Sequence, residues 1–136
     1  MYNIIFYEDK NGYSELNEEL MRIARGAAKS KDLRIQLKQI TYCVELLKNQ
    51  GTNLPTNIAK HISEDIWELR PGNNRMLYFY FENNTFVLLH MFRKQTQKTP
   101  TCEIEKAKKE RNDFIIRNRR INQWELGKII KKMRKK

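Results

Sequence analysis

The sequence predicts an α+β domain in which an N-terminal strand and a helical hairpin pack on a small antiparallel sheet, with C-terminal helices after it. Three observations favour this fold. Apolar residues recur every three or four positions in residues 14–50, aromatic and branched residues fill residues 66–94, and charged residues are frequent in residues 100–136. A chain of 136 residues is long enough for one hydrophobic core, so we expect a single domain spanning residues 1–136.

The first fifty residues predict one strand and two helices. The apolar run "YNIIFY" at positions 2–7 is typical of a strand, and Ser14 is suited to cap the helix that follows. The two helices carry apolar stripes: Leu16, Leu20, Ile23 and Ala27, then Leu33, Leu37, Ile40, Val44 and Leu47. Gly51 is expected to end the second helix. Residues 52–65 are expected to be a connecting loop, with a helical turn around Ala59.

The middle of the chain predicts a three-strand antiparallel meander. The strands are "IWELR" (66–70), "RMLYFYFE" (75–82) and "TFVLLHMFRK" (85–94), separated by the turn signals "PGNN" and "NN". Both alternating sets of side chains are apolar in the last two strands, so we expect both faces of the sheet to be covered. A helix follows Pro100, and Asn122 is expected to break it before a final basic segment.

The charge is distributed very unevenly. The net charge is +11, and residues 93–136 contain 16 Lys and Arg against 5 Asp and Glu, whereas residues 1–92 contain 11 of each. The entire excess therefore begins at Arg93. Such asymmetry indicates a polyanionic partner, either nucleic acid or an acidic protein.

Other classes of protein are disfavoured. No apolar stretch is long enough for a membrane span, and the N-terminal segment "MYNIIFYEDK" is too short and too acidic for a signal peptide. Cys43 and Cys102 lack metal-ligand spacing, and we expect both to be reduced in a cytoplasmic protein. We expect no metal, no cofactor and no membrane partner.

Strand pairing predicts that basic side chains from distant parts of the chain meet at one end of the sheet. A four-residue loop "PGNN" sets Arg70 opposite Arg75, and a two-residue turn at "NN" sets Arg75 opposite Phe92 and Leu77 opposite His90. Alternation then assigns Glu68, Arg70, Arg75, Leu77, His90 and Lys94 to one face, and Trp67, Leu69, Met76, Tyr78, Tyr80, Leu89, Met91 and Arg93 to the other. A slip of one residue in either turn would exchange Arg93 and Lys94 between the faces.

Gathering like charges at one rim is unfavourable for an isolated protein, by a few tenths to about 1 kcal/mol for directly opposed arginines. A phosphate-rich ligand would reward the arrangement, because guanidinium groups bind phosphate oxygens in a bidentate manner. Arg70, Arg75, Arg93 and Lys94 therefore predict a phosphate site. The alternative is that Glu68 neutralises Arg70 or Arg75 and forms a structural salt-bridge cluster.

These residues also carry a resemblance to a known family. The segment from "IWELR" through Arg75 and "VLLHMF" to "RKQTQKTP" and the Lys/Glu helix resembles toxins of type II toxin–antitoxin modules in the RelE/ParE superfamily, in the HigB-like, phage-derived branch. The resemblance implies a RelE-like fold and a metal-independent mRNA interferase that cuts mRNA in the ribosomal A site. It also implies neutralisation by a HigA-like helix-turn-helix antitoxin, through which alone the toxin would contact operator DNA.

The resemblance implies roles for particular residues. Arg75 matches the arginine that grips phosphate after the turn, Arg93 and Lys94 match the basic pair at the end of the last strand, and Glu68 and Arg70 match charged positions. The chain departs from well-known members in having Glu68 where they have a lysine, and in lacking a catalytic tyrosine near Thr99.

The expected chemistry is attack by a ribose 2′-hydroxyl on its own 3′ phosphate. Glu68 or His90 is the candidate general base, and Arg75 with Arg70 would stabilise the charged transition state. Lys94 or Arg93 would clamp a flanking phosphate or assist the leaving 5′ oxygen. The structural alternatives are a core histidine at position 90 and an ion-pair role for Glu68.

Further residues are candidate RNA contacts. Tyr78 and Tyr80 are suited to stack an unpaired base, although an aromatic stripe in a strand is usually core. Positive charge beyond the sheet predicts contacts with mRNA and ribosomal RNA; the candidates are Lys98, Arg119, Arg120, Lys131 and Lys132. The alternative for the C-terminal residues is a solvated helix.

Two other functions stay open. One is a binding toxin without nuclease activity, such as the gyrase-poisoning relatives in the same superfamily. The other is an inactive phage protein that only binds an antitoxin and DNA as a co-repressor. Retention of the basic residues Arg70, Arg75, Arg93 and Lys94 together favours the nuclease.

Overall fold

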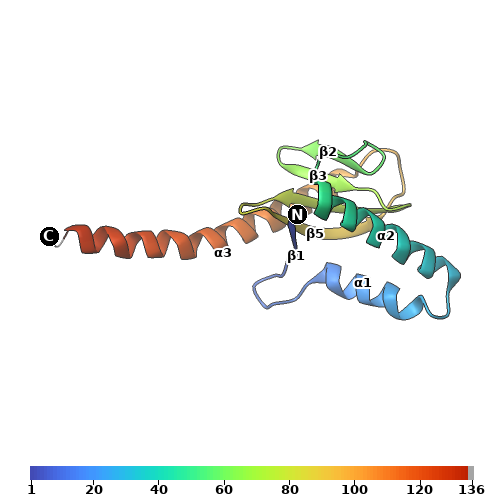
Figure 1. Ribbon diagram of the computed structural model, residues 1–136, viewed down its shortest axis with the longest axis horizontal. Coiled ribbons are helices and arrows are strands. Elements are labelled where there is room, and N and C mark those ends of the chain that lie inside the picture. The colour runs from blue at the N-terminus through green and yellow to red at the C-terminus, as the bar shows by residue number, and fades with distance from the viewer. Residues whose placement is uncertain (135–136) are drawn as a thin grey trace.

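The computed structural model describes the backbone of residues 1–134, together with the side-chain surroundings of residues 1–118 and of Lys131. The elements are β1 (Asn3–Phe6), α1 (Glu15–Gly26), α2 (Lys31–Gln50), β2 (Ala59–Ser63), β3 (Ile66–Leu69), β4 (Asn74–Tyr80), β5 (Thr85–Arg93) and α3 (Thr101–Arg134). They form one five-stranded sheet in the order β1-β5-β4-β3-β2. The predicted α+β class is confirmed, with the helical hairpin on the sheet as expected (Figure 1).

The sheet has a hydrophobic core on each face. On one face, side chains of α1 and α2 such as Leu16 and Leu47 pack against sheet residues that include Tyr78 and Leu88. On the other face, α3 contributes Ala107 and Phe114 to a second cluster with further sheet residues: Ile66, Leu77, Phe79, Val87 and Leu89. The prediction that both faces are covered is therefore confirmed.

Capping residues delimit both helices of the hairpin, and two of them, Ser14 and Gly51, were predicted from the sequence. The Ser14 hydroxyl accepts a hydrogen bond from the Asn17 N–H at 3.1 Å, which caps α1. The Ser30 hydroxyl does the same for α2 through the Leu33 N–H at 3.2 Å. Gly51 follows α2 with a φ of 67°, a left-handed value that a residue without a side chain adopts at low cost.

Two strand assignments differ from the expectation. Ala59–Ser63 is strand β2, which pairs antiparallel with β3, and is not part of a loop with a helical turn. Its pairing is with residues later in the chain, so local pattern did not reveal it. β1 lies beside β5 in parallel, with Ile4 opposite Phe86, so the sheet is mixed and the antiparallel strands form only part of it.

At the cationic end of the sheet, β4 and β5 pair in the predicted register. Nearer the hairpin turn their register differs from the predicted one. Near the hairpin turn Tyr80 pairs with Phe86, one residue out of the predicted register, because the turn is longer than two residues. A bulge between Leu77 and Tyr78 restores the register, so that Leu77 pairs with His90. As a result Leu89 lies in the cluster under α3, and its assignment to the opposite face was wrong.

The C-terminal region is a single helix. α3 is continuous from Thr101 to Arg134, so the expected break at Asn122 and the separate final helix were wrong. Asn is a weak helix former, but the residues around it include good ones and no proline, so local propensity does not interrupt the helix. The second half of α3 projects away from the sheet (Figure 1). None of the helices among the described residues is long and apolar enough to cross a membrane.

Candidate functional site

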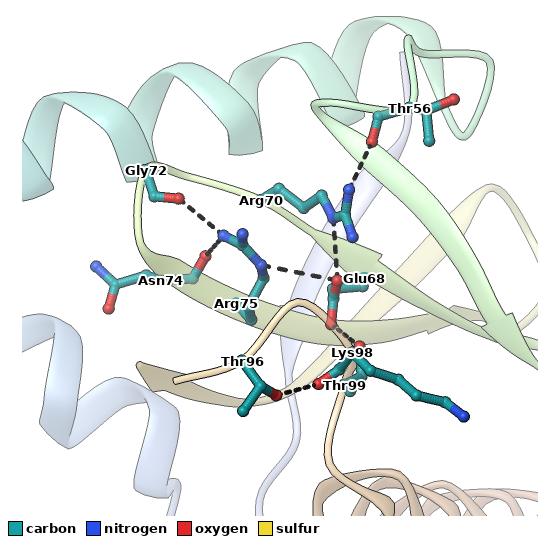
Figure 2. Close-up of polar contacts among 9 residues, drawn as sticks. All are labelled: Thr56, Glu68, Arg70, Gly72, Asn74, Arg75, Thr96, Lys98 and Thr99. Carbon is teal, nitrogen blue, oxygen red and sulfur yellow. Dashed lines mark hydrogen bonds and ion pairs between the residues drawn. The ribbon is translucent and has the colours of Figure 1, made fainter. Parts of the chain in front are cut away.

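Glu68 is the centre of a polar cluster at the end of the sheet where β3 and β4 are joined (Figure 2). Its side chain is 1% exposed, and its Oε1 accepts a hydrogen bond from Arg70 Nε at 3.0 Å. Arg75 Nε lies 3.8 Å from the same oxygen. Arg70 and Arg75 therefore converge on one carboxylate, as strand pairing predicted.

Backbone carbonyl groups hold both arginines in place. Arg75 Nη1 donates to the carbonyl oxygens of Gly72 and Asn74, each at 2.8 Å, which ties its guanidinium to the turn between β3 and β4. Gly72 has a φ of 60°, a left-handed conformation that glycine adopts at little cost. Arg70 Nη1 donates to the Thr56 carbonyl at 3.3 Å. The turn between β3 and β4 thus fixes the direction of the Arg75 guanidinium, and the segment before β2 fixes that of Arg70.

The connection between β5 and α3 closes over this cluster. Glu68, Arg75, Phe92, Lys94 and residues 95–100 enclose a space of only about 10 Å³. Thr99 Oγ1 donates to Glu68 Oε2 at 2.6 Å, and this contact was not predicted from the sequence. A water molecule needs roughly 10–15 Å³, so the enclosed space has no room for a phosphate group.

The cluster keeps an excess of positive charge. One carboxylate, Glu68, faces the guanidinium groups of Arg70 and Arg75, and Lys94 lines the same space. Burial lowers the pKa of Arg75; the Glu68 charge raises that pKa and the Arg70 charge lowers it further. An arginine titrates so far above neutral pH that Arg75 stays charged. Glu68 therefore neutralises part, but not all, of the positive charge of the cluster.

Lys94 and Arg93 lie on opposite faces of the sheet. The Lys94 N–H bonds to the Asn73 carbonyl at 2.7 Å, and its side chain lines the Glu68 cluster. Arg93 pairs with Asn74, whose side chain bonds to Gln36 of α2. Paired residues share a face, so Arg93 lies on the α2 side. This is the face predicted for it, and because Arg93 does not face Glu68 the geometry argues against its predicted catalytic role.

His90 is a buried structural residue in this arrangement. It is 1% exposed, with Nδ1 at 2.6 Å from Glu110 Oε1 and Nε2 at 3.0 Å from Glu103 Oε1. Leu77 lies between it and Glu68 across the sheet. Because both ring nitrogens contact carboxylates of α3, the geometry argues against His90 as the general base.

The aromatic candidates lie away from the cluster. Tyr78 is completely buried in the core beneath α1 and α2, so its expected stacking on an RNA base was wrong. Its hydroxyl is buried without a hydrogen-bond partner among the described residues, and burial raises its pKa above the ordinary value. Tyr80 is 45% exposed, but it lies at the other end of the sheet, where its hydroxyl accepts the Asn84 N–H at 3.1 Å.

The remaining basic candidates are peripheral to Glu68. Lys98 is exposed, and its ammonium group points away from Glu68 (Figure 2). Lys131 is exposed on the projecting part of α3. The side chains of Arg119, Arg120 and Lys132 lie outside the described residues.

α3 is attached to the sheet by polar contacts that the sequence did not indicate. Tyr7 OH donates to Asp113 Oδ2 at 2.7 Å, and Arg117, also in α3, donates to the Glu8 carbonyl. On the other side, Arg111 bonds to Asp65. Within the part of the chain that the structure describes, no group of His, Cys, Asp and Glu side chains is arranged to hold a metal ion.

Larger hollows flank β1 and do not fit a polyanion. One of about 560 Å³ has a single cationic side chain, Lys48, in its lining, together with Glu82. Another of about 500 Å³ is lined by Glu8 and Glu18 and by no cationic residue. The Glu68 cluster therefore remains the candidate site despite its small volume.

Comparisons with known proteins show similarity to toxins of known structure. The YoeB dimer from Staphylococcus aureus is 14% identical with a TM-score of 0.48, covering 70% of this chain and 97% of that chain. The heterotetrameric YoeB–YefM toxin–antitoxin complex from the same organism is 13% identical, with a TM-score of 0.48 and coverage of 71% and 98%. No curated protein sequence matches the chain.

A family model also matches most of the chain. It describes the family as "Phage derived protein Gp49-like (DUF891)" and matches residues 13–112. This match includes α1, α2, the whole of β2 to β5 and the first part of α3. The phage-derived branch expected from the sequence is therefore confirmed, and the chain belongs to the Gp49-like family.

Proposed function

We propose that this protein is the toxin of a type II toxin–antitoxin pair and that it is an endoribonuclease cleaving mRNA on the ribosome. The observation that carries the proposal is the convergence of Arg70 and Arg75 on the buried carboxylate of Glu68, in a space that Lys94 also lines. Three cations supply the charge that an RNA phosphate requires, and one carboxylate supplies a proton acceptor. Membership of the Gp49-like family supports the proposal.

The proposed reaction is a displacement at phosphorus. Glu68 takes the proton of a ribose 2′-hydroxyl, and the 2′ oxygen forms a bond to the adjacent phosphorus. The bond from phosphorus to the 5′ oxygen breaks, and Lys94 donates a proton to that oxygen. Arg70 and Arg75 stabilise the additional negative charge on the phosphate oxygens in the transition state. The products are a 2′,3′-cyclic phosphate and a 5′-hydroxyl.

The proposed partners are the ribosome with its mRNA, and an antitoxin. Residues 119–136, which include the projecting part of α3, are rich in Lys and Arg, which favours contact with ribosomal RNA. A HigA-like helix-turn-helix antitoxin is proposed to neutralise the toxin and to carry it to operator DNA.

Mapping of mRNA ends after brief induction tests the function. We expect discrete cuts that appear only on translated messages, with 5′-hydroxyl ends, and no such cuts on a message whose start codon has been removed. Growth arrest with altered DNA supercoiling and intact mRNA would support the gyrase-poisoning alternative instead. The absence of both growth arrest and cuts, with the protein folded and present, would favour the inactive co-repressor.

A further inference from the structure

Thr99 places a hydroxyl group on Glu68 where the proposed reaction needs a ribose hydroxyl. Its Oγ1 donates to Glu68 Oε2 at 2.6 Å, while Glu68 Oε1 is occupied by Arg70. We propose that residues 95–100 form a gate over the cationic cluster, held shut by Thr99, and that an RNA 2′-hydroxyl replaces the Thr99 hydroxyl on Glu68 when the gate opens. The part played by RNA in this inference rests on the proposed function.

The closed gate leaves no room for substrate. The space between the gate and Glu68, Arg75 and Lys94 is about 10 Å³, and Glu68 is 1% exposed. An RNA phosphate can reach Arg75 only if the gate moves, since β4 and β5 form the wall behind it. The structure is therefore a state in which the site is occupied by the protein's own side chains.

The gate is built to move as one piece. At one end the Lys94 N–H is bonded to the Asn73 carbonyl, and at the other the Pro100 carbonyl accepts the N–H groups of Glu103 and Ile104 at the start of α3. Between these anchors, Thr96 Oγ1 donates to the Lys98 carbonyl at 2.7 Å, a contact internal to the gate.

A single hydrogen bond connects the interior of the gate to the rest of the protein. Among the described residues, the bond from Thr99 to Glu68 is the only hydrogen bond between residues 95–99 and any residue outside them. The side chains of residues 95–98 are exposed (Figure 2 shows Thr96 and Lys98), so little apolar contact holds the gate closed. Loss of this bond should therefore favour the open state.

The exchange of the Thr99 hydroxyl for an RNA 2′-hydroxyl leaves the number of hydrogen bonds to Glu68 unchanged. In the closed state Glu68 Oε2 accepts from a threonine hydroxyl, and in the open complex it accepts from the 2′-hydroxyl of RNA, which is then placed to lose its proton. DNA lacks that hydroxyl and would leave a buried carboxylate oxygen without its donor, which is costly. The gate thus predicts that RNA binds more tightly than DNA of the same sequence.

Thr99→Val tests the hydrogen bond from Thr99 to Glu68, which we call the latch. Valine keeps the shape of threonine and removes the hydroxyl donor. The first measurement needs no RNA: trypsin should cut after Lys98 faster in Thr99→Val than in the wild type. The second measurement is the binding of a short single-stranded oligoribonucleotide and its DNA counterpart at fixed salt. We expect RNA affinity to rise about tenfold, which corresponds to ~1.4 kcal/mol, and the preference for RNA over DNA to persist.

Two matched variants complete the test. Thr99→Ser keeps the hydroxyl and should behave as the wild type in both measurements. Thr96→Val removes the hydroxyl that bonds only within the gate, and it should leave RNA affinity unchanged. Thermal unfolding identifies any variant that is damaged globally, and Thr99→Ala replaces Thr99→Val if the latter does not fold.

The possible results distinguish failure of the proposed hydrogen-bond latch from failure of the proposed function. Unchanged trypsin cleavage in Thr99→Val would overturn the latch. Faster cleavage with unchanged or weaker RNA binding would overturn the gate, and equal binding of RNA and DNA by the wild type would overturn replacement of the Thr99 hydroxyl. Failure of every protein, wild type included, to bind RNA would overturn the role of RNA in opening the gate. The trypsin result would still decide the bond between Thr99 and Glu68, and the mapping of mRNA ends would still decide the proposed function.

Discussion

Arg75 and Glu68 form an ion pair that runs diagonally between β4 and β3, with Nε 3.8 Å from Oε1. The closer partner of that oxygen is Arg70, at 3.0 Å. Arg75 is oriented instead by the carbonyl oxygens of Gly72 and Asn74. Its guanidinium therefore keeps its direction when Glu68 releases it, and it is already oriented to bind a phosphate once the gate opens.

Replacement of Arg75 by alanine is expected to abolish growth inhibition. The change removes the guanidinium proposed to stabilise the transition state, and loss of one such donor costs about 10²–10³ in rate. It also removes two hydrogen bonds to the turn, at a cost of about 1 kcal/mol in the free energy of unfolding. Primer extension on mRNA and chemical denaturation measure the two effects separately.

Arg93→Ala is the matched control for this variant. It removes the same charge from the same end of the sheet, but Arg93 lies on the α2 side, away from Glu68. We expect its mRNA cuts to match those of the wild type. An Arg75→Ala protein that is folded and still cuts mRNA at the wild-type rate would refute the assignment of the phosphate site.

His90→Ala is expected to reduce stability rather than chemistry. The change leaves Glu103 and Glu110 facing each other without the ring that joins them. Leaving a buried hydrogen-bonding group without its partner costs about 1–3 kcal/mol. Denaturation should show this loss, and the folded fraction should cleave RNA at the wild-type rate per molecule. A folded, stable and inactive His90→Ala protein would return His90 to the list of catalytic candidates.

Local sequence pattern determined the helices well because their signals are local. Ser14 marks the start of α1 and Gly51 marks the end of α2. Both act through contacts within a few residues, so both helix ends were predictable. β2 was missed because its partner β3 defines it, and a stretch containing Lys60 and His61 has no strand pattern of its own. The break expected at Asn122 was wrong because a single weak helix former does not interrupt a favourable helical run.

The site was predictable where it depends on register and unpredictable where it depends on packing. The pairing of Glu68 with Leu77 places Arg75, two residues before Leu77, on the same face as Glu68, as predicted. The pairing of Arg75 with Phe92 brings Lys94 to that face, as the turn lengths suggested. A longer hairpin turn and a compensating bulge produced that pairing, and two offsetting shifts cannot be read from the residues. The Thr99 contact depends on how residues 95–100 fold back, which no periodic pattern encodes.

Tyr78→Phe is expected to stabilise the protein. The Tyr78 hydroxyl is buried without a partner among the described residues, and a buried unpaired hydroxyl costs about 1–3 kcal/mol. Phenylalanine keeps the ring that packs against Phe86 and removes that cost. The free energy of unfolding should rise by about 1 kcal/mol, with RNA cleavage unchanged. Loss of cleavage without loss of stability would show that the hydroxyl acts on RNA.

Tyr7 is expected to contribute a pH-dependent term to stability at alkaline pH. Burial and the hydrogen bond to Asp113 raise the pKa of Tyr7 to about 12. In the unfolded chain a tyrosine ionises near pH 10, so the folded state is favoured below that pH and loses the advantage as the pH rises to about 12. Denaturation at several pH values should show a steeper loss between these limits in the wild type than in Tyr7→Phe. Parallel curves for the two proteins would contradict this contribution.

Truncation after Asn118 tests whether the projecting part of α3 binds RNA. The core contacts of α3, through Ala107 and Phe114, lie before that point, so thermal unfolding should change little. Residues 119–136 contain eight Lys and Arg and one Glu, and each phosphate they neutralise contributes about 0.7–0.9 to the slope of log affinity against log salt. The truncated protein should bind RNA more weakly at low salt and show a shallower slope. If the slope and the affinity are unchanged, the segment is a solvated helix, and the basic cluster around Glu68 has to account for RNA binding alone.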